Sequence, residues 1–223
     1  ELRQEFISTA SHELQSPLTS IAGLATALRD ERLPPETRLR YISIIEEEAG
    51  RLSRLSDALL RLTSLEAGGL RPRAEAASLD ASIRSAALAA EPRCRAKGIG
   101  LELDLERVEA SVDAAMLAQV WTNLLGNAIK FGGPGGRVRV ELRRSGGLAV
   151  ARFSDDGAGI AAEDLPFVFD RFFKADRSRS RADPDSGSGL GLAIARKIVE
   201  LHGGSVRAES AGLGAGSSYT VEL

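Results

Sequence analysis

Apolar residues recur every three or four positions through the first part of the chain, which is the spacing of one helical face. The first stripe consists of Phe6, Ala10, Leu14, Leu18, Ile21, Ala25 and Leu28. The second stripe consists of Leu39, Ile42, Ile45, Ala49, Leu52, Leu59 and Leu62. Leu33-Pro34-Pro35 separates them, because proline cannot continue a helix. The pattern predicts one helix over about residues 2–30 and a second helix that begins near Glu36.

A short loop joins the two predicted helices, so they form an antiparallel hairpin over residues 1–66. A hairpin alone cannot cover the apolar stripes of both of its helices. Two copies of the hairpin make a four-helix bundle, which predicts a homodimer through residues 1–66. A bundle closed by the rest of the chain is the alternative.

The remainder of the chain has shorter and more mixed elements. Residues 67–77, which begin with Ala67-Gly68-Gly69, are predicted to be a linker that contains at most a short edge strand. We expect helices over about residues 78–96, 113–129 and 190–201, the first capped by Ser78 or Asp80 and the second by Asp113. Strands are expected over 99–105, 108–112, 137–142, 148–154, 205–209 and 218–223. Helices and antiparallel strands without strict alternation predict an α+β fold in residues 78–223, with one sheet covered by helices on one face.

Composition narrows the class of protein. The net charge of −2 gives no reason to expect nucleic acid as a partner. A single cysteine, Cys94, rules out an internal disulfide, and no apolar run is long enough for a membrane span. Only Lys97, Lys130, Lys174 and Lys197 are lysines, so a lysine inside a motif is informative. Because the chain opens in mid-pattern at Glu1, we expect it to be part of a longer protein.

The segment Ser11-His12-Glu13-Leu14-Gln15-Ser16-Pro17-Leu18-Thr19 lies inside the first helix. His12 is off the apolar stripe, so its imidazole should face water next to the Glu13 carboxylate. Such an imidazole can act as a nucleophile through one ring nitrogen while the carboxylate holds or removes the proton of the other. Pro17 is expected to bend the helix after the histidine. A solvated surface histidine without a role is the alternative.

A helical face in the second half carries Asn123, Asn127 and Lys130, spaced four and three residues apart. An amide oxygen can ligate Mg²⁺, and a lysine can pair with phosphate. Phe131 follows directly and offers a ring that can stack on a purine. A polar solvent-facing surface with Phe131 in the core is the alternative.

Two glycine-containing segments complete the candidate chemistry. Asp155-Asp156-Gly157-Ala158-Gly159-Ile160 follows a predicted strand, where a carboxylate can accept hydrogen bonds from an adenine amino group. Gly187-Ser188-Gly189-Leu190-Gly191-Leu192 opens a predicted helix, whose backbone N–H groups can bind phosphate. The polar loop between Phe173 and Gly187 carries Lys174, Arg177, Arg179 and Arg181, which predicts a mobile lid over a nucleotide.

Together these segments resemble the catalytic core of a bacterial two-component sensor histidine kinase. Residues 11–19 are similar to its phosphoacceptor box, 121–131 to its asparagine box and 155–160 to its first glycine box. Residues 169–174 resemble its phenylalanine box and 187–192 its second glycine box. The resemblance covers essentially the whole chain and implies a dimeric helical hairpin, followed by an α/β-sandwich ATP-binding domain of the histidine-kinase, gyrase and heat-shock-chaperone type.

The resemblance also implies roles for individual residues. His12 would accept the γ-phosphoryl group of ATP with Glu13 as general base, and the group would pass to an aspartate of a response-regulator receiver domain. Asn127 would ligate Mg²⁺, Asp155 would bind adenine and Phe131 would stack on it. The implied ATP site as a whole consists of Asn123, Asn127, Lys130, Phe131, Asp155, Gly157, Gly159, Lys174, Gly187, Gly189, Leu190 and Gly191. The family also implies a cytoplasmic location below a membrane-anchored sensor, without membrane contact by these residues.

The chain departs from the family at Gln15-Ser16, where Arg-Thr or Arg-Asn is usual. The residue at the position of Ser16 places a water that hydrolyses the phosphorylated partner. Ser16 keeps a hydroxyl but lacks the methyl that restricts rotation, so we expect weak phosphatase activity. His202, in a His-Gly-Gly at a helix end, is interpreted as structural.

Two other functions are consistent with parts of the pattern. An ATPase of the chaperone, gyrase or mismatch-repair type shares the asparagine and glycine segments but lacks the hairpin of residues 1–66. A dimeric scaffold without catalysis would not need Asn127, Asp155 and Gly189 together.

Overall fold

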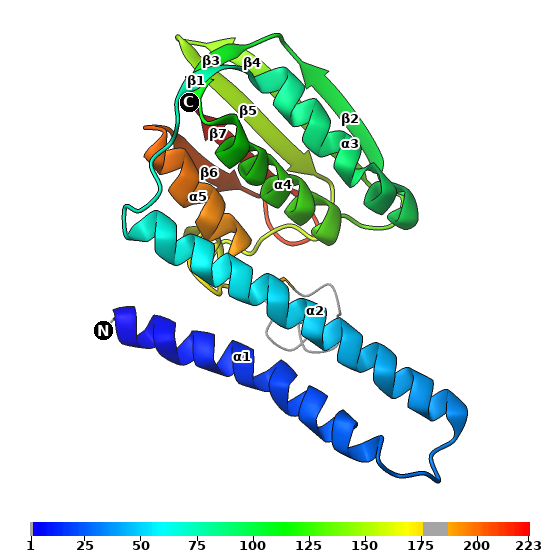
Figure 1. Ribbon diagram of the computed structural model, residues 1–223. Helices are drawn as coiled ribbons and strands as arrows, with labels where there is room; N and C mark the ends of the chain where they lie inside the picture. Colours follow the sequence, from blue (N-terminus) through cyan, green and yellow to red (C-terminus); the bar gives the residue numbers. More distant parts are fainter. Residues whose placement is uncertain (1, 176–186) are drawn as a thin grey trace. The chain divides into compact units, whose positions relative to one another are not determined.

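The computed structural model describes residues 2–175 and 187–223. These residues fold into two compact units. Of the described residues, the first unit contains 2–61 together with 187 and 188, and the second contains 62–175 and 189–223. The first unit is a hairpin of α1 (Leu2–Ala27) and most of α2 (Pro35–Glu66). Figure 1 shows the two long helices and the loop that joins them.

The hairpin differs from the predicted stripe in which residues of α1 are covered. Pro17 is buried and Glu13 is half-buried, whereas Leu18, which was predicted on the buried stripe, is 50% exposed. The helix continues through Pro17 without interruption. Because a proline lacks only one N–H, a long helix packed along a partner can retain it. Ile7, Leu39, Ile42 and Leu60 are also exposed. One hairpin therefore leaves apolar surface uncovered, as the sequence pattern predicts.

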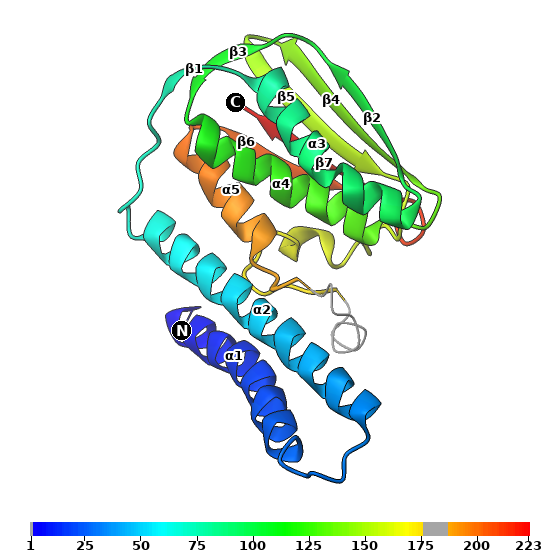
Figure 2. The same cartoon turned by 45° about the vertical axis from the view of Figure 1, so that its right-hand side comes forward.

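The second unit is built on a five-stranded mixed sheet in the order β2-β4-β5-β7-β6. Its strands are β2 (Gly100–Leu105), β4 (Arg137–Ser145), β5 (Leu148–Asp155), β6 (Ser205–Glu209) and β7 (Ser217–Glu222). The helices α3 (Leu79–Lys97), α4 (Ala114–Phe131) and α5 (Gly191–Leu201) cover one face of it (Figures 1 and 2). The strands β1 (Glu75–Ser78) and β3 (Glu109–Val112) pair in a separate two-stranded sheet. A 3₁₀ turn, η1 (Leu165–Phe167), precedes the phenylalanine-rich segment.

One strand pair contradicts the antiparallel arrangement expected from the sequence. β2 and β4 are parallel, with Gly100 opposite Arg137 and Leu105 opposite Leu142. The chain between them contains β3 and α4, which return it to the edge where β2 began. A connection of this length makes a parallel pair possible.

Alternation along the central strands separates a core face from a solvent face. Val138, Val140 and Leu142 of β4 are fully buried, and so is Phe153 of β5. The Phe153 ring stacks on Trp121 of α4, with the centroids 5.6 Å apart. The helix α4 therefore contacts β5 through large apolar side chains.

The start of α4 is defined by Asp113, the predicted cap. Its carboxylate accepts hydrogen bonds from the backbone N–H groups of Met116 (3.0 Å) and Arg73 (3.0 Å). These hydrogen bonds, Arg73 first, lower the pKa of Asp113. The N–H of Asp113 donates to Nε2 of His202 (3.0 Å), which lies at the C-cap of α5. His202 is thus a structural residue at a helix end, as predicted, and its contact with the start of α4 is a feature that the sequence did not predict.

Asp113→Ala should lower the free energy of unfolding by about 1–2 kcal/mol at neutral pH, because two N–H groups lose their acceptor. Since folding lowers the pKa of Asp113, its contribution is present above the unfolded pKa and is lost as the pH falls through the folded value. The difference in the free energy of unfolding between native protein and variant should therefore become smaller in acid. Chemical denaturation at several pH values measures it. Asp164→Ala is the matched control, because Asp164 caps η1 without a side-chain hydrogen bond; an equal loss there would contradict the capping role.

Candidate functional site

The three candidate residues of the phosphoacceptor box lie on α1 in the first unit. His12 and Ser16 are exposed and one helical turn apart, so they share a face. The Glu13 carboxylate is half-buried instead, and its Oε2 lies 3.8 Å from a guanidinium nitrogen of Arg51 on α2. The histidine is therefore accessible to a second reactant, as predicted. Its neighbour Glu13 instead contacts Arg51 of α2.

The polar face of α4 contacts the start of α5. The side-chain N–H₂ of Asn123 donates to the carbonyl oxygen of Gly191 (2.8 Å). Asn123 thus joins the asparagine segment to the second glycine segment. Because an amide nitrogen carries two hydrogens, the second one can donate to a phosphate oxygen of a nucleotide, while the amide oxygen can accept from a ligand N–H or ligate a metal.

Lys130 and Phe131 lie at the last turn of α4. The Phe131 ring is 47% exposed, so the alternative that placed it in the core is wrong. The ammonium of Lys130 lies over this ring, 4.9 Å from its centroid. An exposed ring beside a cation is a suitable surface for a flat, electron-rich base with phosphates attached.

Asp155 is the buried polar group of the site. It ends β5, is only 8% exposed, and accepts hydrogen bonds from the N–H of Gly157 (3.0 Å) and the hydroxyl of Ser217 (2.6 Å). Burial raises the pKa of the Asp155 carboxyl, and these hydrogen bonds only partly oppose the shift. The neighbouring Asp156 has a structural role, because it accepts the N–H of Arg137 (2.8 Å).

Tyr219 on β7 lies beside this carboxylate. The ring is 3% exposed and packs edge-on against Phe169, with the centroids 6.4 Å apart. Burial raises the pKa of the Tyr219 hydroxyl, while hydrogen bonds with the Ser217 and Asn127 side chains act against the shift. The predicted metal ligand Asn127 therefore lies in the same cluster as Asp155.

Gly157 and Gly159 are required by contacts inside the protein. A Cβ on Gly157 would lie 2.1 Å from the carbonyl oxygen of Phe131, and one on Gly159 would lie 2.0 Å from that of Gly212. Gly159 also has a φ of +67°, which favours glycine. These glycines let three backbone segments meet next to Asp155.

The third of these segments, the loop between β6 and β7, was not predicted as part of the site. The N–H of Gly214 donates to the carbonyl of Ala158 (2.7 Å), and the N–H of Gly216 donates to the carbonyl of Gly157 (3.2 Å). Ser210 accepts the N–H of Ile160 (3.0 Å), and Ser217 contacts Asp155. The available signal was the alternation of Gly212, Gly214 and Gly216 before the last strand.

The second glycine segment packs on the phenylalanine segment. The N–H of Phe172 donates to the carbonyl of Gly189 (2.9 Å), and a Cβ on Gly189 would lie 2.8 Å from the Cα of Phe172. Phe172 has a φ of 62°, which is unusual for a residue with a side chain and is often found at functional sites. Leu190, the N-cap residue of α5, is fully buried.

The remaining predicted residues are less informative. Gly187 is exposed and Lys174 half-buried. The other cations of the predicted lid, Arg177, Arg179 and Arg181, fall within residues 176–186 and so lie outside the described residues.

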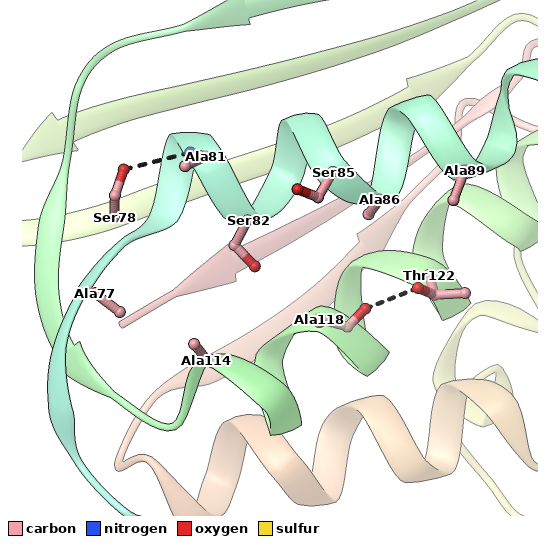
Figure 3. A pocket seen from close by; sticks show the side chains of 10 residues that line it. All are labelled: Ala77, Ser78, Ala81, Ser82, Ser85, Ala86, Ala89, Ala114, Ala118 and Thr122. Carbon is pink, nitrogen blue, oxygen red and sulfur yellow. Dashed lines mark hydrogen bonds between the residues drawn. The ribbon is translucent and has the colours of Figure 1, made fainter.

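A surface groove of about 540 Å³ lies between α3 and α4 and is separate from the predicted ATP site. Figure 3 shows that alanine, serine and threonine side chains line it, among them Ala118 and Thr122 of α4. It contains no charged side chain and none of the predicted site residues. The structure therefore brings the predicted ATP-site residues of α4, β5 and α5 together elsewhere in the second unit.

Comparison with known proteins identifies the two regions. Residues 112–223 match the family of histidine kinase-, DNA gyrase B-, and HSP90-like ATPases. The chain belongs to this family. Residues 2–68 match the His Kinase A (phospho-acceptor) domain. The two matches in this order are those of the catalytic core of a two-component histidine kinase, as the sequence motifs predicted. The phospho-acceptor match distinguishes this core from the gyrase-type and chaperone-type ATPases, which lack the hairpin.

Individual relatives agree with this assignment. The chain is 39% identical over 99% of its length to the sensor protein SphS of Synechococcus elongatus, of which it covers 54%. The structure of ThkA in complex with the response regulator protein TrrA matches 98% of this chain and 60% of that one, with 26% identity and a TM-score of 0.78. Acinetobacter baumannii histidine kinase AdeS has the same fold over 95% of this chain and 96% of its own, with 24% identity and a TM-score of 0.78. The histidine-kinase core thus spans about half the length of SphS.

None of the helices in residues 2–175 and 187–223 is long and apolar enough to cross a membrane. In the same part of the chain, no group of three His, Cys, Asp or Glu side chains is placed to hold a metal ion.

Asp155→Asn provides a test of the raised pKa in the protein without nucleotide. A raised folded pKa means that the carboxyl favours folding below its unfolded pKa, near 3.9, and that this contribution is lost as the pH rises through the folded value. Native protein should therefore gain stability relative to the variant as the pH falls, and differ from it by no more than about 1 kcal/mol at neutral pH. Denaturation curves between acid and neutral pH measure the difference. Asp156→Asn, at an exposed carboxylate, is the control; a native advantage that grows toward neutral pH would contradict burial as the cause.

Proposed function

We propose that this histidine-kinase core binds ATP with Mg²⁺ in the second unit, transfers the γ-phosphoryl group to His12 and passes it to an aspartate of a response regulator. The observation that carries the proposal is the combination of an exposed histidine inside the phospho-acceptor match with a buried carboxylate inside the ATPase match. We further propose that residues 1–66 are the dimerisation and phosphotransfer hairpin, 67–77 the linker and 78–223 the ATP-binding domain.

The nucleotide is held by groups that differ in chemistry. The buried Asp155 carboxylate accepts a hydrogen bond from the adenine amino group, and the exposed Phe131 ring stacks on the base. Lys130 pairs with phosphate oxygens, together with Lys174 and the backbone N–H groups around Gly187, Gly189 and Gly191. The nearby glycines Gly157 and Gly159 keep the backbone close to the base.

The oxygen of the Asn127 amide suits Mg²⁺, a hard cation that takes oxygen ligands. A magnesium ion bound by one amide takes its other ligands from phosphate oxygens and water, which fits an ion that arrives with the nucleotide. Asn127 is held by its contact with Tyr219, and Asn123 by Gly191, so both amides are oriented before nucleotide binds. When bound, the ion neutralises charge on the phosphates.

In the transfer step, a ring nitrogen of His12 attacks the γ-phosphorus of ATP. A bond forms between nitrogen and phosphorus, the bond from phosphorus to the β–γ bridging oxygen breaks, and ADP leaves with that oxygen. The proton on the other ring nitrogen passes to Glu13, whose carboxylate is oriented by Arg51. Phosphoryl transfer depends mainly on positioning and charge neutralisation, which these groups supply.

The partners follow from the same surfaces. The exposed apolar residues Ile7, Leu18, Leu39, Ile42 and Leu60 support a homodimer through residues 1–66, in which two hairpins form a four-helix bundle. The match to ThkA, solved with the response regulator TrrA, supports a receiver domain as the second partner. We propose that the whole protein is a membrane-anchored bacterial sensor whose cytoplasmic part contains this chain.

Incubation with ATP labelled at the γ-phosphate tests the function. Native protein should form a product that is stable in base and labile in acid, as phosphoramidates are, and His12→Ala should abolish labelling while it leaves ATP binding intact. Asp155→Asn should instead weaken ATP binding, measured by calorimetry, because a buried charged acceptor is lost. Labelling that survives in His12→Ala would show that another residue is phosphorylated. Turnover of ATP without labelling would favour the simple ATPase, and no ATP binding would favour the scaffold.

Ser16→Thr should raise phosphatase activity toward the regulator and change the labelling rate of His12 by no more than a few-fold. Ser16 is exposed one turn from His12, so its hydroxyl lies beside the route of an attacking water. A threonine methyl limits rotation about χ1 and should hold that water better. The measurement is decay of phosphorylated regulator with ADP present. Equal decay with serine and threonine would rule out a role for the methyl.

A further inference from the structure

The last turn of α4 has an unusual set of hydrogen-bond partners. The last four carbonyl groups of a helix have no partner within it. In α4, the carbonyl of Ala128 accepts a hydrogen bond from the N–H of Gly132 (2.9 Å), and the carbonyl of Phe131 accepts one from the N–H of Ala158 (3.0 Å). The two carbonyls between them, of Ile129 and Lys130, both accept from a side chain of another helix.

That side chain is Lys97, which lies in the last turn of α3. Its ammonium donates to the carbonyl of Ile129 (3.1 Å) and to that of Lys130 (2.9 Å). A cation is also favourable at this position, because the C-terminal end of a helix carries partial negative charge. One lysine therefore completes the hydrogen bonding of the turn that carries Lys130 and Phe131.

The end of α3 places Lys97 there. Gly98 has a φ of 67° and donates its N–H to Arg95 (3.1 Å), and the N–H of Ile99 donates to Cys94 (2.9 Å). These bonds end α3 directly after Lys97. A Cβ added to Gly132 would lie 3.2 Å from Cδ1 of the buried Ile99, so the two helix ends are in contact.

We propose that Lys97 is a positioning residue for nucleotide binding, and that it acts by fixing the last turn of α4. The inference rests on the proposed ATP site. The turn supports the Phe131 ring and the Lys130 ammonium through its backbone, and its final carbonyl holds Ala158 of the first glycine segment. Without Lys97, two carbonyls turn toward water, and both the stacking ring and the glycine segment lose a fixed attachment relative to Asp155.

The expected consequence is a loss of nucleotide affinity with little change in chemistry. Asn127 lies one turn earlier in α4 and is held by Tyr219. His12 lies on α1. Neither has a hydrogen bond to Lys97 among those of the described residues, so the rate at saturating ATP should be nearly preserved.

The test uses the 223-residue chain with Lys97→Met, Lys97→Arg and Lys197→Met. Lys197 is the matched control, because it is a lysine on a helix whose ammonium lies 3.8 Å from Glu200 at the surface. Binding of a fluorescent ADP analogue and the ATP dependence of His12 labelling are measured for each. Lys97→Met should raise both the Kd and the KM about tenfold and change kcat by less than threefold. Lys97→Arg, which keeps a cationic donor, and Lys197→Met should both stay within threefold of native protein.

Several results would overturn the inference. A Lys97→Met variant that melts at a lower temperature but keeps the native Kd and KM would show a purely structural lysine. An equal loss in Lys97→Arg would show that a cationic donor is not what the turn needs, and an equal loss in Lys197→Met would show a general charge effect. Failure of native protein to bind the analogue would instead refute the proposed ATP site, so the two failures are distinct.

Discussion

The burial of the Asp155 carboxylate is the constraint around which the second unit is arranged. A carboxylate that is 8% exposed loses most of its hydration and destabilises the fold unless hydrogen bonds replace the lost water. Gly157 and Ser217 supply two such bonds, yet the pKa of Asp155 remains raised. The carboxylate is thus better matched to a ligand that donates hydrogen bonds than to the protein alone. Stability is given up at the residue proposed to select adenine, a common arrangement at binding sites.

Holding that carboxylate next to a stacking ring requires close contact between backbones. The end of α4, the turn after β5 and the loop after β6 approach each other so closely that a Cβ at Gly157 or Gly159 would overlap a carbonyl oxygen. Backbone hydrogen bonds from Ala158, Gly214 and Gly216 join the three segments. The glycines of the motif therefore serve the architecture of the site first, and its ligand through that architecture.

The two units differ in whether their candidate functional residues are buried or exposed. The second unit needs a preorganised pocket, and it achieves this with helices packed on one face of a twisted sheet and fixed at their ends by Asp113, His202 and Gly98. The first unit is proposed to present a nucleophile to a second reactant, and α1 leaves His12 exposed while Glu13 lies near Arg51. Its uncovered apolar residues are suited to a second hairpin, since a two-helix layer has no closed core.

Local patterns were sufficient to predict the helices, their caps and most strands, because each depends on neighbours within a few residues. Asp113 caps α4 as the sequence indicated, and of the two candidates Ser78 and Asp80 it is Ser78 that caps α3. The motifs around His12, Asn127 and Asp155 identified the family. What required the tertiary structure involves partners distant in sequence. The parallel pairing of β2 with β4, the contact of Ser217 with Asp155, the Asn123 bond to Gly191 and the Lys97 bonds to α4 join residues 32 or more positions apart. No periodicity encodes such contacts, because they arise only when the helices and the sheet pack and bring unpaired donors and acceptors within reach of each other.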